Sequence, residues 1–175
     1  GFVREWHGVD RIVDWMASPG APGNAHLLIV GDGPIRAALE QQARRLGLDG
    51  RVTFTGVIDR HAVPEHVAAF DVALQPAVVP YASPLKLMEY LVMGKAIVAP
   101  RQPNLLEVLS DGHNSLMFDA KDPTGLEEAL SRVSADGELR QRLGLEARAT
   151  IERLDLTWLG NARKVVALAQ ECSGR

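Results

Sequence analysis

Short apolar runs alternate with amphipathic segments along almost the whole chain. Glycine or proline bounds most of the apolar runs, as is typical of buried strands, and the amphipathic segments carry apolar residues on one helical face. The pattern predicts strands at residues 26–33, 51–56, 71–76, 96–99 and 115–118. It predicts helices at residues 34–48, 63–70 and 104–112, a helix that opens at Ser83, and a helical stretch from Asp122 with breaks near Gly137 and Asp155.

Strands that are apolar on both faces and alternate with helices through short loops are typical of a parallel sheet covered by helices. We therefore expect an α/β fold, a doubly wound parallel sheet of the Rossmann-like kind, with extra helices at the C-terminus. A chain of 175 residues is long enough for one domain with a sizeable core. Residues 1–3, "GFV", have the composition of the end of a strand, so we expect the chain to be part of a longer protein.

The composition argues against several classes of protein. The formal charge of −3 and the scattered lysines and arginines argue against a nucleic-acid surface. No apolar run approaches the ~20 residues of a membrane-spanning helix. The single cysteine, Cys172, can form no disulfide within the chain. We expect a cytoplasmic protein without a transmembrane segment and without a nucleic-acid partner.

The chain offers few residues for a metal site or for a phosphate loop. Its five histidines form no His-x-His or His-x-x-x-His pair, and no Asp-x-Asp pair is present to hold a metal with a diphosphate. The loop "GDGPIR" has Arg36 in place of the third glycine of a dinucleotide loop. Taken alone, Gly31 and Gly33 therefore indicate a tight strand-to-helix turn. No metal and no cofactor are expected.

A lysine and a glutamate stand in a helix that is otherwise almost wholly apolar, "SPLKLMEYLV" at residues 83–92. Ser83 is the expected N-cap and Pro84 the first-turn residue, which puts Lys86 where the helix dipole disfavours a cation. An exposed Lys86–Glu89 pair would explain both residues and would contribute only about 0.3 kcal/mol. The apolar residues, however, predict a mostly buried helix, in which a charge is costly. They are Leu85, Leu87, Met88, Leu91 and Val92.

A bound anion would resolve both the charge and its location. The amides of Ser83, Leu85 and Lys86, together with the Lys86 ammonium, would hold its negative charge. Glu89, one turn further along, would accept hydrogen bonds from hydroxyl groups such as those of a ribose. An anion next to a diol indicates a nucleotide, and both interpretations of the pair stay open at this point. Asn104 and Glu107, by contrast, have the spacing of a structural capping box.

Six segments resemble, in this order, the C-terminal domain of a family 4 (group 1) glycosyltransferase, a two-domain enzyme of the GT-B type. They are "WHGVDRIVDWMA", "LLIVGDGPIRAALE", "VTFTGVI", "SPLKLMEYLVMGKAIVAP", "EVLSDGHNSLMF" with Asp122, and "TW". The resemblance implies that residues 1–153 form a Rossmann-like domain that binds a nucleotide-sugar donor. It implies that residues 154–175 form a helix that packs toward a missing N-terminal, acceptor-binding domain.

The resemblance also implies roles for individual residues. Glu89 corresponds to the second acid of the family's Glu-x7-Glu motif, which binds the donor ribose. Gly56, Val57 and Ile58 correspond to the segment that meets the base. The other implied donor-binding residues lie in the glycine turn and at the helix start next to the diphosphate: Gly31, Gly33, Ser83, Pro84, Leu85 and Lys86. The residues implied to neutralise the departing phosphate are Arg4, His7 and Lys86.

The chain departs from the family pattern at three positions. Phe2 stands where the family has arginine, His7 where it has lysine, and Ala82 where it has the first glutamate of the motif. Arg4 is expected to replace the arginine. A cationic His7 would make transfer fall as the pH rises above its pKa.

The implied function is the retaining, metal-independent transfer of a sugar from a nucleoside diphosphate sugar, as in polysaccharide, glycolipid or cell-envelope glycan synthesis. We expect this half alone to be inactive, and we expect any peripheral contact with the inner face of the plasma membrane to come from the missing half. Two alternatives stay open. One is a catalytically degenerate nucleotide-binding module, indicated by Phe2 and Ala82, and the other is half of a sugar-nucleotide epimerase.

Overall fold

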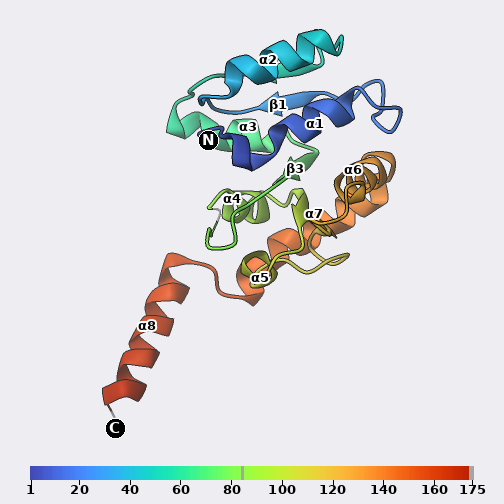
Figure 1. Ribbon diagram of the computed structural model, residues 1–175. Coiled ribbons are helices and arrows are strands. Elements are labelled where there is room, and N and C mark those ends of the chain that lie inside the picture. Colours follow the sequence, from blue (N-terminus) through green and yellow to red (C-terminus); the bar gives the residue numbers. More distant parts are fainter. Residues whose placement is uncertain (84, 174–175) are drawn as a thin grey trace.

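Strands and helices alternate along the chain as the apolar pattern predicts. The structure, a computed structural model, describes residues 1–83 and 85–173. Its strands are β1 (Leu27–Ile29), β2 (Val52–Phe54), β3 (Val72–Leu74), β4 (Ala96–Pro100) and β5 (Leu116–Phe118). Its helices (Figure 1) are η1 (Glu5–His7), α1 (Val9–Met16), α2 (Arg36–Arg45), η2 (Arg60–Ala62), α3 (Val63–Ala68), α4 (Lys86–Val92), α5 (Pro103–Leu106), α6 (Gly125–Ala135), α7 (Gly137–Arg153) and α8 (Trp158–Ser173).

The strands of the described residues pair in parallel, in two groups. β1 pairs with β2, with Leu28 opposite Thr53. β4 lies between β3 and β5, with Ala73 opposite Ile97 on one side and Val98 opposite Leu116 on the other. The predicted α/β class with parallel strands is therefore confirmed.

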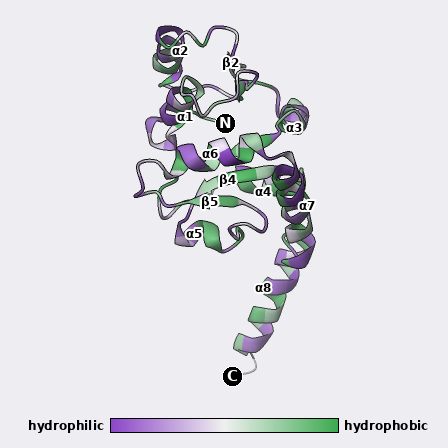
Figure 2. Ribbon diagram, turned by 90° about the vertical axis from the view of Figure 1, so that its right-hand side faces the viewer, coloured by the Kyte–Doolittle hydropathy of each residue, from purple (hydrophilic) through white to green (hydrophobic). Residues whose placement is uncertain are grey.

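Helices cover both faces of the β3–β4–β5 group, which makes it doubly wound. Alternate residues of a strand point to opposite faces. Val98 and Phe118 pack in one apolar cluster with α1 and α6, whereas Ile97 and Met117 pack in a second cluster with α4, α5 and α7. Every residue of β4 and β5 is buried, and Figure 2 shows these strands in the green of hydrophobic residues, with α5 and α6 on either side. This burial on both faces is the reason why the two strands read as continuous apolar runs.

Two helices, α1 and α4, differ from the sequence predictions. Helix α1 was not predicted, although it buries Ile12, Val13, Trp15 and Met16 at helical spacing. Helix α4 begins at Lys86, with Leu85 at its N-cap, so the expected cap at Ser83 is wrong. The predicted first-turn residue of that helix, Pro84, lies outside the described residues.

The predicted capping box at Asn104 is also wrong, because α5 begins one residue earlier and its N-cap is Gln102. The side chain of Asn104 instead donates hydrogen bonds to the carbonyls of Val79 (3.3 Å) and Ala82 (2.6 Å). These two hydrogen bonds hold the loop that leads into α4 in place.

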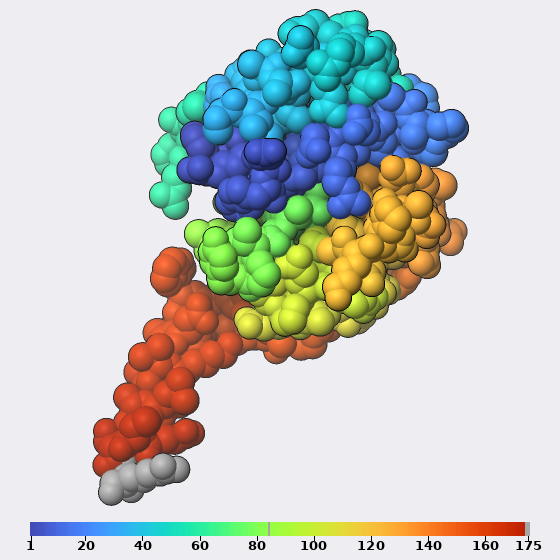
Figure 3. Space-filling model, in the orientation of Figure 1, coloured from blue at the N-terminus to red at the C-terminus, as the bar shows by residue number. Residues whose placement is uncertain are grey.

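Helix α8 extends away from the rest of the molecule (Figures 1 and 3). The break near Asp155 is confirmed, since that residue adopts a positive φ of 47° between α7 and α8. Trp158, Val165 and Leu168 are exposed on the helix. Whether residues 154–175 form a separate unit that packs on another domain stays a prediction.

Two glycines bring α4 and α7 into direct contact. Gly94 ends α4 with a φ of +61°, and Gly144 lies buried in α7 against it. A Cβ atom on Gly144 would collide with the carbonyl oxygen of Gly94. Since backbone oxygen cannot move aside as a flexible side chain can, only glycine fits at residue 144. This contact sets the position of α4, which carries Lys86 and Glu89.

We predict that Gly144→Ala lowers the free energy of unfolding by about 1–3 kcal/mol, the usual cost of overfilling a packed site. The matched control is Gly137→Ala at the start of the same helix, where the nearest side-chain atom, Nη2 of Arg140, would lie 3.5 Å away. The control should change stability by no more than about 0.5 kcal/mol. Urea denaturation followed by circular dichroism measures both, and equal stability of the two variants would contradict the close contact.

Candidate functional site

A cavity of about 1050 Å³ lies between the β1–β2 group and the β3–β4–β5 group. At one end, beyond the carboxyl ends of the strands, its lining includes four polar side chains: His7, Lys86, Glu89 and Tyr90. We call these four residues the polar end of the cavity. His7 comes from η1 and the other three from α4, so two distant parts of the chain build it. Ligands of parallel sheets bind at this edge.

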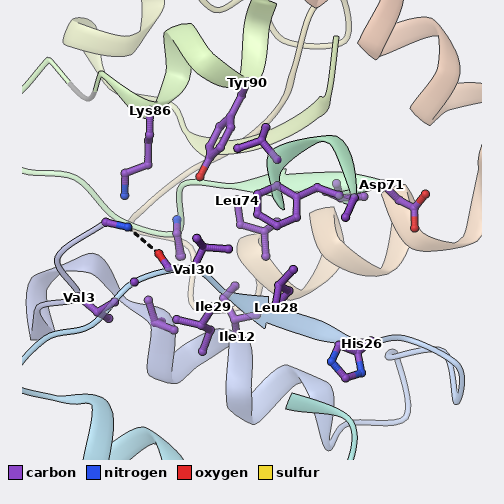
Figure 4. A pocket seen from close by; sticks show the side chains of 18 of the residues that line it. Val3, Ile12, His26, Leu28, Ile29, Val30, Asp71, Leu74, Lys86 and Tyr90 are labelled. Carbon is purple, nitrogen blue, oxygen red and sulfur yellow. Dashed lines mark hydrogen bonds between the residues drawn. The ribbon is translucent and has the colours of Figure 1, made fainter. Parts of the chain in front are cut away.

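Lys86 points into the cavity rather than into bulk solvent (Figure 4). Burial lowers the pKa of its ammonium, and the nearby Glu89 carboxylate opposes that shift. The two side chains nevertheless form no ion pair within the described part of the chain, so the simple exposed Lys86–Glu89 pair is not what the structure shows. A partly desolvated ammonium that faces a cavity favours an anionic ligand.

Glu89 and Tyr90 line the same end of the cavity. The Glu89 side chain is exposed. The Tyr90 ring packs edge-on against Phe70, with 6.3 Å between ring centroids, and its hydroxyl points into the cavity (Figure 4). Burial raises the pKa of Tyr90 above its usual value, and the Glu89 charge adds to this shift, so the hydroxyl stays protonated at neutral pH. Tyr90 was not predicted from the sequence, where its only signal was a polar tip next to Glu89 in an apolar helix.

His7 reaches the polar end as a neutral imidazole. Its Nδ1 accepts a hydrogen bond from the Arg4 backbone N–H at 3.0 Å, which leaves the ring proton on Nε2. Burial, and then the positive charges of Lys86 and Arg4, lower the pKa of His7 to about 4. The expected cationic His7, with transfer falling above its pKa, is therefore wrong. His7 can offer an N–H donor but not a charge near pH 7.

Close packing against residues 1–3 requires glycine at residues 31 and 33, and the sequence alone does not show this contact. The backbone of residues 1–3 crosses directly over them: Cβ atoms at Gly31 and Gly33 would collide with the carbonyl oxygens of Gly1 and Val3, respectively. Gly31 also has a φ of +126°. The tight-turn interpretation is thus supported, and Gly31 lines the cavity whereas Gly33 is not part of its described lining.

The segment from Gly56 to Ile58 reaches the cavity with its last two residues. Val57 is 84% exposed, and Ile58 is partly buried. Gly56 itself has a φ of +69° and lies against Arg36, whose Nη1 would be 2.9 Å from a Cβ atom there. Arg36 in turn forms ion pairs with Asp32 (3.0 Å) and Glu40 (2.7 Å). This network fixes the turn next to Val57.

Arg4, Ser83 and Leu85 are not brought into the described lining of the cavity. The Arg4 guanidinium lies over the Phe2 ring, 4.8 Å from its centroid. Ser83 is exposed, and the Leu85 side chain is 79% exposed, so Leu85 is an exception to the predicted burial of most of the helix, in which Leu87 and Leu91 are buried. The amides of Ser83 and Leu85, which were expected to bind an anion in the first turn of the helix, precede α4, which starts at Lys86. Pro84 lies outside the description.

Neither a metal cluster nor a membrane-spanning helix is present among the described residues. No group of three His, Cys, Asp or Glu side chains gathers there in a way that could hold a metal ion. None of the described helices has the length and apolar character needed to cross a membrane.

The sequence profile of the family "Glycosyl transferases group 1" matches residues 1–136. The chain belongs to this family. It is 33% identical to the GDP-mannose-dependent alpha-(1-6)-phosphatidylinositol dimannoside mannosyltransferase of Mycobacterium tuberculosis. This match of 161 residues covers 90% of this chain and 39% of the relative. It is 32% identical to the lipopolysaccharide core biosynthesis glycosyltransferase LpsE of Rhizobium meliloti, over 86% of this chain and 43% of the relative.

Solved structures of group 1 and other GT-B glycosyltransferases share the fold. HepE of Anabaena in complex with UDP superposes with a TM-score of 0.83 at 23% identity, over 97% of this chain and 47% of HepE. The C-terminal domain of LpcC, a group 1 protein of Francisella tularensis, gives a TM-score of 0.77 at 18% identity, over 87% and 82% of the two chains. The chain thus has the Rossmann-like fold of a GT-B half, and it spans less than half the length of the curated relatives named above.

We predict that His7 of this member of the group 1 family titrates with a pKa of about 4. As the pH falls from the ordinary histidine value near 6.5 to about 4, the unfolded chain binds a proton that the folded chain does not. Stability therefore falls over that range. NMR titration of the imidazole carbons measures the pKa directly.

The Lys86→Gln variant provides the matched control for this titration. Removing the ammonium removes one cause of the depressed pKa, so the midpoint of His7 should move upward. A wild-type midpoint near 6.5, or no movement in the variant, would contradict the proximity of His7 and Lys86.

Proposed function

We propose that this chain is the donor-binding half of a retaining glycosyltransferase that uses a nucleoside diphosphate sugar. One observation carries the proposal: Lys86 and Glu89 lie unpaired with each other at the polar end of a cavity, in a chain that matches the group 1 family. Such a donor needs two contacts: a cation that binds its phosphates and a carboxylate that binds its ribose hydroxyls. Acceptor recognition then belongs to a second, N-terminal domain.

The demanding step of the proposed transfer is the departure of the nucleoside diphosphate. The bond between the anomeric carbon and the diphosphate oxygen breaks, and the electron pair stays on that oxygen. The acceptor hydroxyl oxygen forms the new bond on the same face, and its proton passes to the departing diphosphate. The Lys86 ammonium would stabilise the developing negative charge, which is worth most where water is scarce. His7 would add a neutral Nε2–H donor. We propose that these groups act without a metal ion or another cofactor.

The other end of the donor would meet Glu89, Val57 and Ile58. An exposed carboxylate can accept hydrogen bonds from both hydroxyls of a ribose. Val57 and Ile58 offer apolar contact for a base. Some fold neighbours were solved with UDP or UDP-glucose, and one relative uses GDP-mannose. We therefore propose a nucleoside diphosphate sugar as the class of donor, and the binding experiment below identifies its base.

The proposal predicts that the chain binds nucleoside diphosphates and their sugars, and that Glu89→Gln and Lys86→Gln each weaken binding about tenfold. A lost hydrogen bond or contact to a charged group costs about 1.4 kcal/mol or somewhat more. Saturation-transfer NMR against UDP, GDP, ADP and their sugars measures binding and identifies the base. Binding should weaken with added salt in the wild type and less steeply in Lys86→Gln.

Matched controls are Glu152→Gln and Lys121→Gln, which replace exposed residues outside the described cavity lining. Both should bind as the wild type does. Wild-type affinity in Glu89→Gln would remove Glu89 from the site. Donor binding without turnover, once the chain is joined to an acceptor domain, would favour the catalytically degenerate module.

A further inference from the structure

Tyr90 is the residue of the polar end to which the proposed transfer gives no role. Its ring packs against the apolar cluster that holds α4 in the core, and edge-on against Phe70, with 6.3 Å between the ring centroids and 73° between the ring planes. Aromatic pairs favour this geometry, so the contact with Phe70 restricts the orientation of the ring. Packing, and not a hydrogen bond, therefore fixes where the Tyr90 hydroxyl lies.

The Tyr90 hydroxyl points into the cavity and forms no hydrogen bond with the residues that the structure describes (Figure 4). At the other end of the residue, the backbone carbonyl accepts a hydrogen bond from the Lys95 N–H at 3.0 Å. Burial, and then the Glu89 charge, raise the pKa of Tyr90, so the hydroxyl keeps its proton near neutral pH. Because the hydroxyls of buried tyrosines usually find a hydrogen-bond partner, an acceptor for this one is to be sought among groups that enter the cavity.

Lys86 and His7 place two further hydrogen-bond donors at the same end of the cavity. Lys86 lies four residues before Tyr90 on α4, and residues four apart lie on the same face of a helix. Both side chains extend from α4 into the cavity (Figure 4), and His7 lines it from η1 with the ring proton on Nε2. The Glu89 carboxylate is the one anionic group among these four side chains. An end of a cavity in which donors outnumber acceptors suits a ligand with several acceptor oxygens.

We propose that the Tyr90 hydroxyl donates a hydrogen bond to an oxygen of the donor diphosphate, beside the ammonium of Lys86. This inference rests on the proposed function and adds a contact to it. Hydrogen bonds to an ionised acceptor such as a phosphate oxygen are among the strong ones. Because the phenol carries no charge, it adds no repulsion to the Lys86 ammonium, whose pKa burial already lowers. A neutral donor held in place by Phe70 is preorganised for the negative charge that develops as the diphosphate departs.

The test compares Tyr90→Phe with Tyr81→Phe, the matching change at the other tyrosine of the chain. Phenylalanine at residue 90 loses the hydroxyl but keeps the ring that packs against Phe70. Tyr81 is 89% exposed and lies outside the described lining of the cavity. Isothermal titration calorimetry measures the affinity of each variant for inorganic pyrophosphate, for UDP, GDP and ADP, and for the three nucleosides without phosphate.

Tyr90→Phe should bind pyrophosphate and the preferred nucleoside diphosphate about tenfold more weakly than the wild type, the usual effect of losing one hydrogen bond to a charged group. The matching nucleoside should bind as it does to the wild type, and Tyr81→Phe should bind every ligand as the wild type does. Because the hydroxyl carries no charge, added salt should weaken diphosphate binding as steeply in Tyr90→Phe as in the wild type. Unchanged diphosphate affinity in Tyr90→Phe, an equal loss for the nucleoside, or a shallower salt dependence would each contradict the proposal.

Fluorine NMR tests the same contact without a substitution at residue 90. The chain is labelled with 3-fluorotyrosine, and its two resonances are assigned with Tyr81→Phe. Saturation with pyrophosphate or with the preferred nucleoside diphosphate should move the Tyr90 resonance and leave that of Tyr81 in place. A Tyr90 resonance that stays in place while UDP, GDP or ADP binds would overturn the role of Tyr90 and leave the proposed function standing. A chain that binds none of these ligands would overturn both.

Discussion

The crossing of residues 1–3 over Gly31 and Gly33 is the contact on which the candidate site depends. It joins the start of the chain to the carboxyl end of β1 through backbone hydrogen bonds, and side chains at either glycine would prevent it. Because η1 follows directly, the crossing also brings His7 close enough to Lys86 for the ammonium to lower the pKa of the imidazole. Two halves of the sequence that are some eighty residues apart thereby share one end of a cavity.

Helix α4 holds its charges under opposing requirements. Leu87 and Leu91 anchor it in the core, and the contact of Gly94 with Gly144 fixes its far end. Lys86, at the start of the helix, lines the cavity. Burial disfavours the charge of the Lys86 ammonium, and the Glu89 carboxylate favours it, although the two side chains form no ion pair with each other. An arrangement that is costly without a ligand and favourable with an anion is typical of a functional site rather than of a stabilising surface pair.

The sequence predicts what local pattern determines and misses what distant contacts determine. β4 and β5 were predicted because burial on both faces makes them continuously apolar. Lys86 and Glu89 were predicted as candidate site residues because charged side chains are unusual in an almost wholly apolar helix. The cap at Ser83 failed because α4 starts only at Lys86, and Asn104 bonds to the Val79–Ala82 loop instead of to its own helix. The tertiary partners of Gly31 and Gly33 lie about thirty residues away, where no local pattern shows them.

The two parts of the cavity differ in chemistry, and this difference bears on the size of the ligand site. The gap between β1 and β3 presents apolar side chains, whereas the polar end presents an ammonium, a carboxylate, a phenol and an imidazole. The polar end lies beyond the carboxyl ends of the strands, the usual ligand position in such sheets. Only that end, and not the full volume of about 1050 Å³, therefore offers the charged groups that the proposed donor would contact.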